Sequence, residues 1–181
     1  MVWQKITAVT LLFTILSSGV SALSSEEQRY DQFVAALQRA SSGEFVFSEN
    51  EALTLLNEGM DELFADTKHV TAAARSVRIR GSTVTVVTDL RVLNLSVSPE
   101  VTFAASVAGE NVVLDIKRLR LGRLPLSVSA LLTTMRAAGL GEYIHVEPRL
   151  GRIVVEKRGA VQRVRAISVR SGSIRVRVGG K

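Results

Sequence analysis

The residues best able to do chemistry are few, and no pattern that catalysis requires groups them. The two histidines, His69 and His145, belong to no HExxH or His-x-His sequence, so neither has the spacing of a metal site. The chain has no cysteine, which excludes a thiol nucleophile, a cysteine zinc site and a disulfide framework. It also has no Gly-x-Ser-x-Gly, P-loop or GxGxxG sequence. We therefore expect a protein that is not an enzyme, with no cofactor, metal site or catalytic residue.

Clustered cations are the other residues with chemical potential. Residues 1–116 hold 8 Lys/Arg and 14 Asp/Glu, a net charge of −6, whereas residues 117–181 hold 15 and 3, a net charge of +12. The boundary falls within residues 116–126, which read IKRLRLGRLPL. A basic surface attracts phosphates, on nucleic acid or on anionic lipid headgroups. We predict that Arg118, Arg120 and Arg123 contact headgroups; the alternative is a solvated strand face, or neutralisation by the acidic half.

The first residues predict export from the cytoplasm. Lys5 precedes an apolar run over residues 6–16, and Val20-Ser21-Ala22 has small residues at the spacing of a signal-peptidase site. Residues 6–23 also have about the length of the shortest membrane-spanning helices, roughly 17 residues. Residues 1–23 are thus either a cleaved signal peptide or an N-terminal anchor. Both place residues 24–181 outside the cytoplasm, as one domain.

Helices are expected at three places. Residues 24–27 form a Ser-x-x-Glu capping box that opens a helix over residues 24–40, and residues 48–51 form a second one. The second helix carries its apolar residues at helical spacing, from Leu53 through Leu56 to Phe64. A third helix begins near Ser127 or Ser129, carries Leu131 and Leu132, and ends at Gly139 or Gly141.

Elsewhere apolar residues alternate with polar ones, which is typical of strands covered on one face. The alternation covers residues 77–80, 84–97, 101–107, 112–116, 153–155, 164–169 and 174–178, with turns at 81–82, 108–111 and 171–172. It slips near Leu93, at Lys117–Arg118 and between Val164 and Ile167, which predicts bulges that bend the sheet. The expected fold is α+β: a curved, mostly antiparallel meander wrapped over amphipathic helices. Residues 76–86 resemble 168–178, so a unit of helix and sheet could occur twice, over 45–121 and 127–178.

A curved sheet closed by amphipathic helices can leave a groove for acyl chains. The predicted apolar lining is Leu53, Leu56, Val113, Leu114, Leu124, Leu131 and Leu132. The alternative is that these side chains fill an ordinary core. Nucleic acid is not expected as a partner, because the chain is exported, has no aromatic residues interleaved with the cations, and has no basic helix to read a groove.

Three segments together resemble the YpmS-like family of bacterial membrane-anchored envelope proteins. They are FVFSENEALTLLN (45–57), VVLDIKRLRLGRLPLS (112–127) and ISVRSGSIRV (167–176, a closing hairpin). More distantly, the layout looks like tubular lipid-binding domains, in which a curved sheet wraps a helix. The resemblance implies lipid handling at the cell surface and carries over no catalytic residue.

The predicted function is therefore non-enzymatic binding of lipid or an anionic membrane surface, with lipid transport or an accessory role as variants. The second hypothesis is a scaffold or accessory subunit that pairs with another envelope protein. The third, a hydrolase acting on lipid or peptidoglycan, requires a serine or carboxylate cluster around a cleft.

Overall fold

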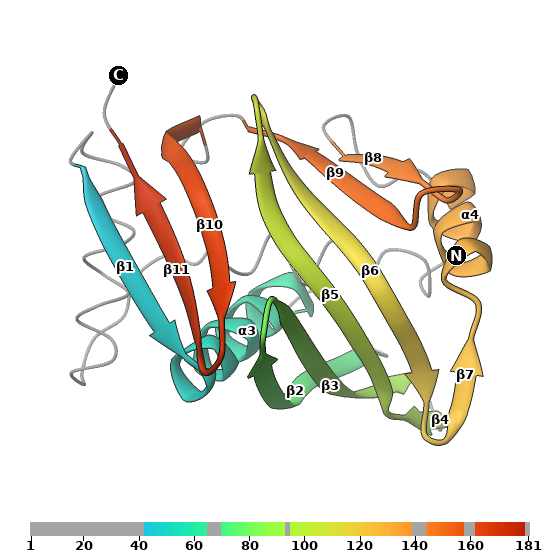
Figure 1. Cartoon of the computed structure of the whole chain (residues 1–181). Coiled ribbons are helices and arrows are strands. Elements are labelled where there is room, and N and C mark those ends of the chain that lie inside the picture. Colours follow the sequence, from blue (N-terminus) through green and yellow to red (C-terminus); the bar gives the residue numbers. More distant parts are fainter. Residues whose placement is uncertain (1–41, 65–69, 93–94, 139–143, 158–161, 180–181) are drawn as a thin grey trace.

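A computed structural model of the chain describes residues 42–64, 70–92, 95–138, 144–157 and 162–179. The predicted signal or anchor segment, residues 1–23, and the predicted helix over residues 24–40 lie outside these ranges. No helix formed by the described residues is long and apolar enough to cross a membrane. The described part contains two helices and two antiparallel sheets (Figure 1).

Helix α3, Glu49–Phe64, begins at the second predicted capping box. The Ser48 hydroxyl accepts from the Glu51 N–H at 3.3 Å, while the Glu51 carboxylate accepts from the Ser48 N–H at 2.7 Å. These two bonds satisfy backbone donors that a helix start would otherwise leave free. Leu56 and Met60, one helical turn apart, are buried on the inner side of the helix.

Helix α4, Val128–Ala138, starts where the sequence indicates, just after Pro125. The Ser127 hydroxyl accepts from the Ala130 N–H at 3.2 Å and so caps its first turn. Leu132 and Met135, three residues apart on one face, are 0% and 1% exposed. The helix packs on strands of the large sheet through this face.

The large sheet has the strand order β2-β3-β5-β6-β9-β8. Its strands are β2 Val70–Arg80, β3 Thr83–Val92, β5 Pro99–Ala108, β6 Asn111–Leu121, β8 Ile144–Glu147 and β9 Arg152–Glu156, and two short strands extend it, β4 Leu95–Val97 and β7 Leu124–Leu126. All pairs are antiparallel. One face is apolar and forms the main core with α3 and α4, as the alternating pattern predicts.

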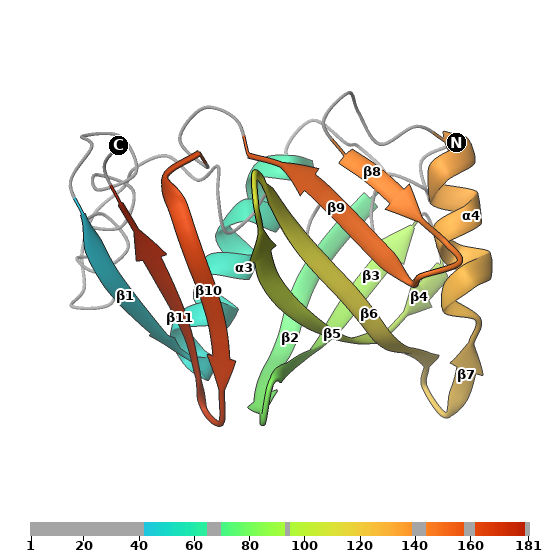
Figure 2. The ribbon, with the colours of Figure 1, turned by 45° about the horizontal axis from the view of Figure 1, so that its top comes forward.

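The small sheet has the order β1-β11-β10, formed by β1 Gly43–Ser48, β10 Val164–Arg170 and β11 Ser173–Val178. It packs on α3 over its own cluster of buried side chains, which includes Phe47, Val164 and Val176. Its β10–β11 turn meets the β2–β3 turn: the Gly172 N–H donates to the Ile79 carbonyl at 3.0 Å, and the Gly81 N–H to the Ser171 hydroxyl at 3.3 Å. The two sheets are therefore joined at their hairpin tips, which lie side by side in both ribbon views (Figures 1 and 2).

Two of the three predicted slips are bulges. The register of β5 against β6 shifts at Lys117, because Thr102 pairs with Arg118 and Phe103 with Ile116. That of β10 against β11 shifts at Arg165. The bulge predicted near Leu93 lies outside the described residues; on either side of it, Val92 of β3 pairs antiparallel with Leu95 of β4. A further shift, between Ala74 and Ser76 in β2, carried no signal in the pattern.

The prediction of a curved sheet that wraps over the helices is wrong. The α+β class and the mostly antiparallel pairing are confirmed, but the strands form two sheets, and neither curls around a helix. The physical reason lies in the helices that cover the apolar face of the large sheet. Helices α3 and α4 have 16 and 11 residues, and they lie at opposite ends of the large sheet, α3 against β2 and α4 against β8 and β6. Two short helices at separate places cover the apolar face of an open sheet, so no axis is available for a sheet to wrap.

Candidate membrane-contact surface

The stretch that spans the charge boundary folds as a hairpin. Leu119, Arg120 and Leu121 of β6 pair with Leu126, Pro125 and Leu124 of β7. Gly122 and Arg123 form the turn, and Gly122 has a φ of +59°, a conformation that glycine adopts without steric cost. After this turn the chain runs back along β6 for three residues before α4 begins.

Strands β7 and β9 pair with two successive stretches of the same edge of β6. Residues Leu119–Leu121 of β6 pair with β7, and Asn111–Asp115 pair with β9. Between them the Ile116 N–H donates to the Gly151 carbonyl, in the β8–β9 turn, at 2.8 Å. Leu119 faces Leu126, so Gly151 and Leu126 are three β6 residues apart, or about 10 Å along the strand. The β7 hairpin and the β8–β9 turn are thus neighbours at one end of the molecule, with the start of α4 beside them (Figure 2).

Three leucines at this end are exposed. Leu124 is 66% exposed and Leu126 is 43% exposed on β7, and Leu150, in the β8–β9 turn, is 62% exposed. The other leucines with described side chains are buried or half-buried. Single exposed apolar residues are ordinary, but several together on one surface mark a contact with a partner or membrane.

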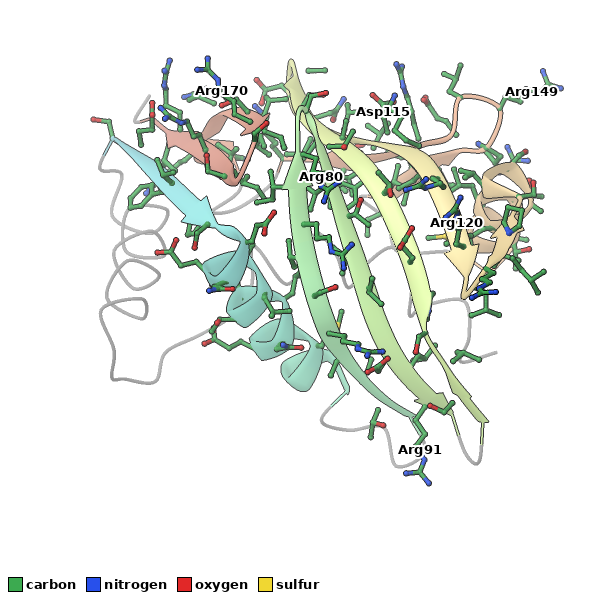
Figure 3. All side chains as sticks on the ribbon, turned by 60° about the horizontal axis from the view of Figure 1, so that its bottom comes forward. Arg80, Arg91, Asp115, Arg120, Arg149 and Arg170 are labelled. Carbon is green, nitrogen blue, oxygen red and sulfur yellow. The ribbon has the colours of Figure 1, made fainter. Side chains whose placement is uncertain are left out.

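Three exposed arginines lie at the same end of the molecule as these leucines. Arg120, Arg123 and Arg149 are exposed, and among the described residues none of them is in an ion pair. Figure 3 shows Arg120 and Arg149 toward the same end of the molecule, away from Arg170. The name leucine edge is used below for the surface formed by Leu124, Leu126 and Leu150 together with Arg120, Arg123 and Arg149.

Arg118 lies two residues before Arg120 on the same face of β6, and it is paired with a carboxylate. On the polar outer face of the large sheet, Arg118 is the register partner of Thr102, and Thr102 is the register partner of Thr85 on the next strand. The hydroxyls of the two threonines are 2.9 Å apart. The Arg118 guanidinium is 3.6 Å from the Glu100 carboxylate. Nearby Lys117 and Arg152 both pair with Asp115, at 4.0 and 2.6 Å. Of the predicted headgroup contacts, Arg118 is therefore in an ion pair, whereas Arg123 and Arg120, which lies opposite Glu100 in the strand register, form none within the described residues.

The seven residues predicted as apolar lining do not all lie together. Leu56, Leu114 and Leu132 are 3%, 1% and 0% exposed within one core, and Leu53 and Leu131 pack half-buried against it. Val113 alternates with buried Val112 and Leu114 on β6 and so lies on the outer face. Leu124 belongs to the leucine edge. The structure therefore brings five of the seven residues together in the main core.

Sequence reasoning missed Leu126, Leu150 and Arg149. A signal existed for two of them, because Pro148-Arg149-Leu150-Gly151 is a turn sequence with an apolar residue at its centre. A leucine held in a tight surface turn has little packing surface available, so its exposure was foreseeable. For Leu126 the local sequence gives no such signal, because nothing local distinguishes the entry to a helix from a short strand.

Among the described residues, no group of three or more histidine, aspartate and glutamate side chains could hold a metal. His145 lies on the exposed face of β8, where its Nε2 is 2.8 Å from the Glu156 carboxylate, as expected of a strand histidine. His69 lies outside the described residues. No family model, curated protein or solved structure matches this chain.

Proposed function

We propose that this chain is a non-enzymatic envelope protein that binds an anionic membrane surface through the leucine edge. The observation that carries the proposal is the coincidence, at one end of the fold, of three exposed leucines with three arginines that have no ion-pair partner among the described residues. Arginines paired to carboxylates gain little from a phosphate, because they must first give up an existing partner. Among the described residues, Arg120, Arg123 and Arg149 have no such ion pair to give up.

The chemistry of arginine suits this role. A guanidinium presents several N–H donors in a planar fork that matches phosphate oxygens, and it stays charged at any physiological pH. Each cation near an anionic leaflet contributes about 1 kcal/mol of attraction, which falls off within a Debye length. Three such residues supply about 3 kcal/mol, enough to orient a domain that residues 1–23 already bring to a membrane. Export, lipid handling and location outside the cytoplasm are parts of the same proposal.

The test uses the full chain and asks which part of the domain approaches lipid. Because the chain has no cysteine, a single donor fluorophore can be attached at Ser129→Cys, an exposed residue in the first turn of α4. The protein is combined with vesicles of phosphatidylcholine alone, or with added phosphatidylglycerol, that contain an acceptor-labelled lipid. We expect stronger energy transfer with the anionic vesicles, and we expect the difference to disappear at 1 M salt, where the Debye length is about 3 Å.

Charge variants provide the control. Replacing Arg120, Arg123 and Arg149 with glutamine should abolish the preference for anionic vesicles. The triple variant R75Q/R78Q/R170Q removes the same charge from exposed arginines of β2 and β10 and should keep the preference. Equal energy transfer on both kinds of vesicle in the unmodified chain would overturn the proposal. A single stoichiometric protein partner, retained in detergent, would favour the scaffold hypothesis instead.

A further inference from the structure

From the arrangement of the two turns we infer that the leucine edge does more than touch headgroups: it inserts Leu124, Leu126 and Leu150 into the acyl boundary of an anionic bilayer. The domain then docks by its end, with the β6–β7 hairpin and the β8–β9 turn as two apolar points of entry. This inference rests on the proposed function and adds to it the depth and orientation of binding.

The first argument is a repeated local sequence. Both turns place an arginine directly before an exposed leucine, Arg123-Leu124 in the hairpin and Arg149-Leu150 in the second turn. Both also combine a glycine and a proline, which favour tight turns at the surface. In a bilayer such a pair divides naturally, because the arginine reaches phosphates while its neighbour enters the hydrocarbon.

The second argument is rigidity. The hairpin is held by pairing along Leu119–Leu121, and the β8–β9 turn by the hydrogen bond from the Ile116 N–H to the Gly151 carbonyl. At Gly151, a Cβ would lie 3.8 Å from Val128 Cγ1, so the turn packs against the start of α4. The three leucines are therefore presented together on a fixed frame, and their insertion orders few additional side chains.

The third argument is the identity of what surrounds the leucines. The exposed residues at the start of α4 are Ser127, Ser129 and Ala130, whose small side chains allow close approach to a flat surface. No described carboxylate forms an ion pair with the arginines of the edge, so an anionic leaflet meets three exposed arginines that are not already held by an ion pair. A zwitterionic surface or an acidic protein would match only one of these properties, whereas an anionic bilayer matches both the charge and the apolar tips.

The experiment places an environment-sensitive fluorophore at one introduced cysteine in the full chain, at Leu124, Leu150 or Val46. Val46 is the matched control, because it is an exposed apolar residue, at 36%, on strand β1 at the far end of the domain (Figure 1). With phosphatidylglycerol-containing vesicles we expect a blue shift at Leu124 and Leu150, and quenching by lipids brominated on the acyl chain. Val46 should show neither change.

A second measurement uses no probe at the edge. In the variants L124N, L126N and L150N, the salt-sensitive component of energy transfer from position 129 should require about tenfold more lipid per substitution. These side chains are exposed, so the variants should unfold at the same denaturant concentration as the parent. If the probes at Leu124 and Leu150 are not quenched while energy transfer from position 129 still depends on anionic lipid, insertion is wrong and the proposed function stands. If that dependence is absent as well, both are wrong.

Discussion

Asn57 is the residue on which we base the most detailed stability prediction. Its side-chain oxygen accepts from the Ala74 N–H at 2.6 Å, and its side-chain nitrogen donates to the Ala74 carbonyl at 3.1 Å. One amide thus satisfies both backbone groups of a residue on strand β2, at the edge of the large sheet. The contact lies immediately before the register shift between Ala74 and Ser76. It therefore connects α3 to a point of the sheet where the strand register shifts.

The change to test is Asn57→Ala. A typical hydrogen bond contributes about 1 kcal/mol net, and a buried backbone group left without a partner costs about 1 to 3 kcal/mol. Ala74 is 6% exposed, so water reaches its backbone poorly. The bonds themselves are only partly buried, which places the expected loss at about 2 kcal/mol. Domains are stable by about 5 to 15 kcal/mol in total, so the loss is large enough to measure.

Urea unfolding of the full chain, followed by circular dichroism, measures the loss as a lower midpoint at constant slope. Asn57→Asp keeps the acceptor for the Ala74 N–H and loses the donor. Its free energy of unfolding should therefore lie between those of the parent and Asn57→Ala. Asn50→Ala, on the exposed side of α3, is the control and should change the stability by less than about 0.5 kcal/mol. The reasoning would be refuted if Asn57→Ala matched Asn50→Ala.

Three further predictions concern stability, all measured by the same urea assay. Ser48→Ala should cost about 1 kcal/mol, because it removes the capping hydroxyl of α3; an unchanged midpoint would mean that Glu51 alone caps the helix. Leu132→Ala should cost about 3 kcal/mol, because this side chain is 0% exposed in the main core, whereas Leu126→Ala should cost less than about 0.5 kcal/mol; equal losses would contradict the burial described for these residues. Gly122→Ala should cost about 1 kcal/mol through its positive φ alone, since nothing lies within 4 Å of the added Cβ, and a stabilising effect would show that the turn adopts another conformation.

Local signals predicted the local elements well. The Ser48 and Glu51 side chains form the capping box that their spacing indicates, and α4 starts within the expected positions. The alternation slips at Lys117 because a bulge inserts one extra residue there, and an extra residue changes the face that the following leucine occupies. Between Val92 and Leu95 the chain reverses from β3 to β4, and a reversal also changes the parity. The alternation alone does not distinguish a bulge from a turn.

The arrangement of the strands and the location of the site were less predictable. One-faced alternation shows that a strand has a covered side, but it does not show what covers it or whether the strands share one sheet. The same ambiguity affected Leu114 and Leu124: both were predicted to line one groove, yet one is 1% exposed and the other 66%. Burial depends on which element packs against the residue, and here that element comes from another part of the chain.

The pairing of β1 with β11 has a consequence for how the chain folds. Gly43 pairs with Val178 and Ser48 with Ser173, so the first and last described strands complete one sheet. Contacts that distant in sequence form slowly, because the entropy of closing the intervening loop is lost before the contact stabilises the fold. During synthesis, β1 has no β11 to pair with until residues 173–178 have been made. A nascent chain thus carries an apolar strand, with Phe45 and Phe47, that lacks its final partner, and a truncation before Ser173 leaves it so permanently.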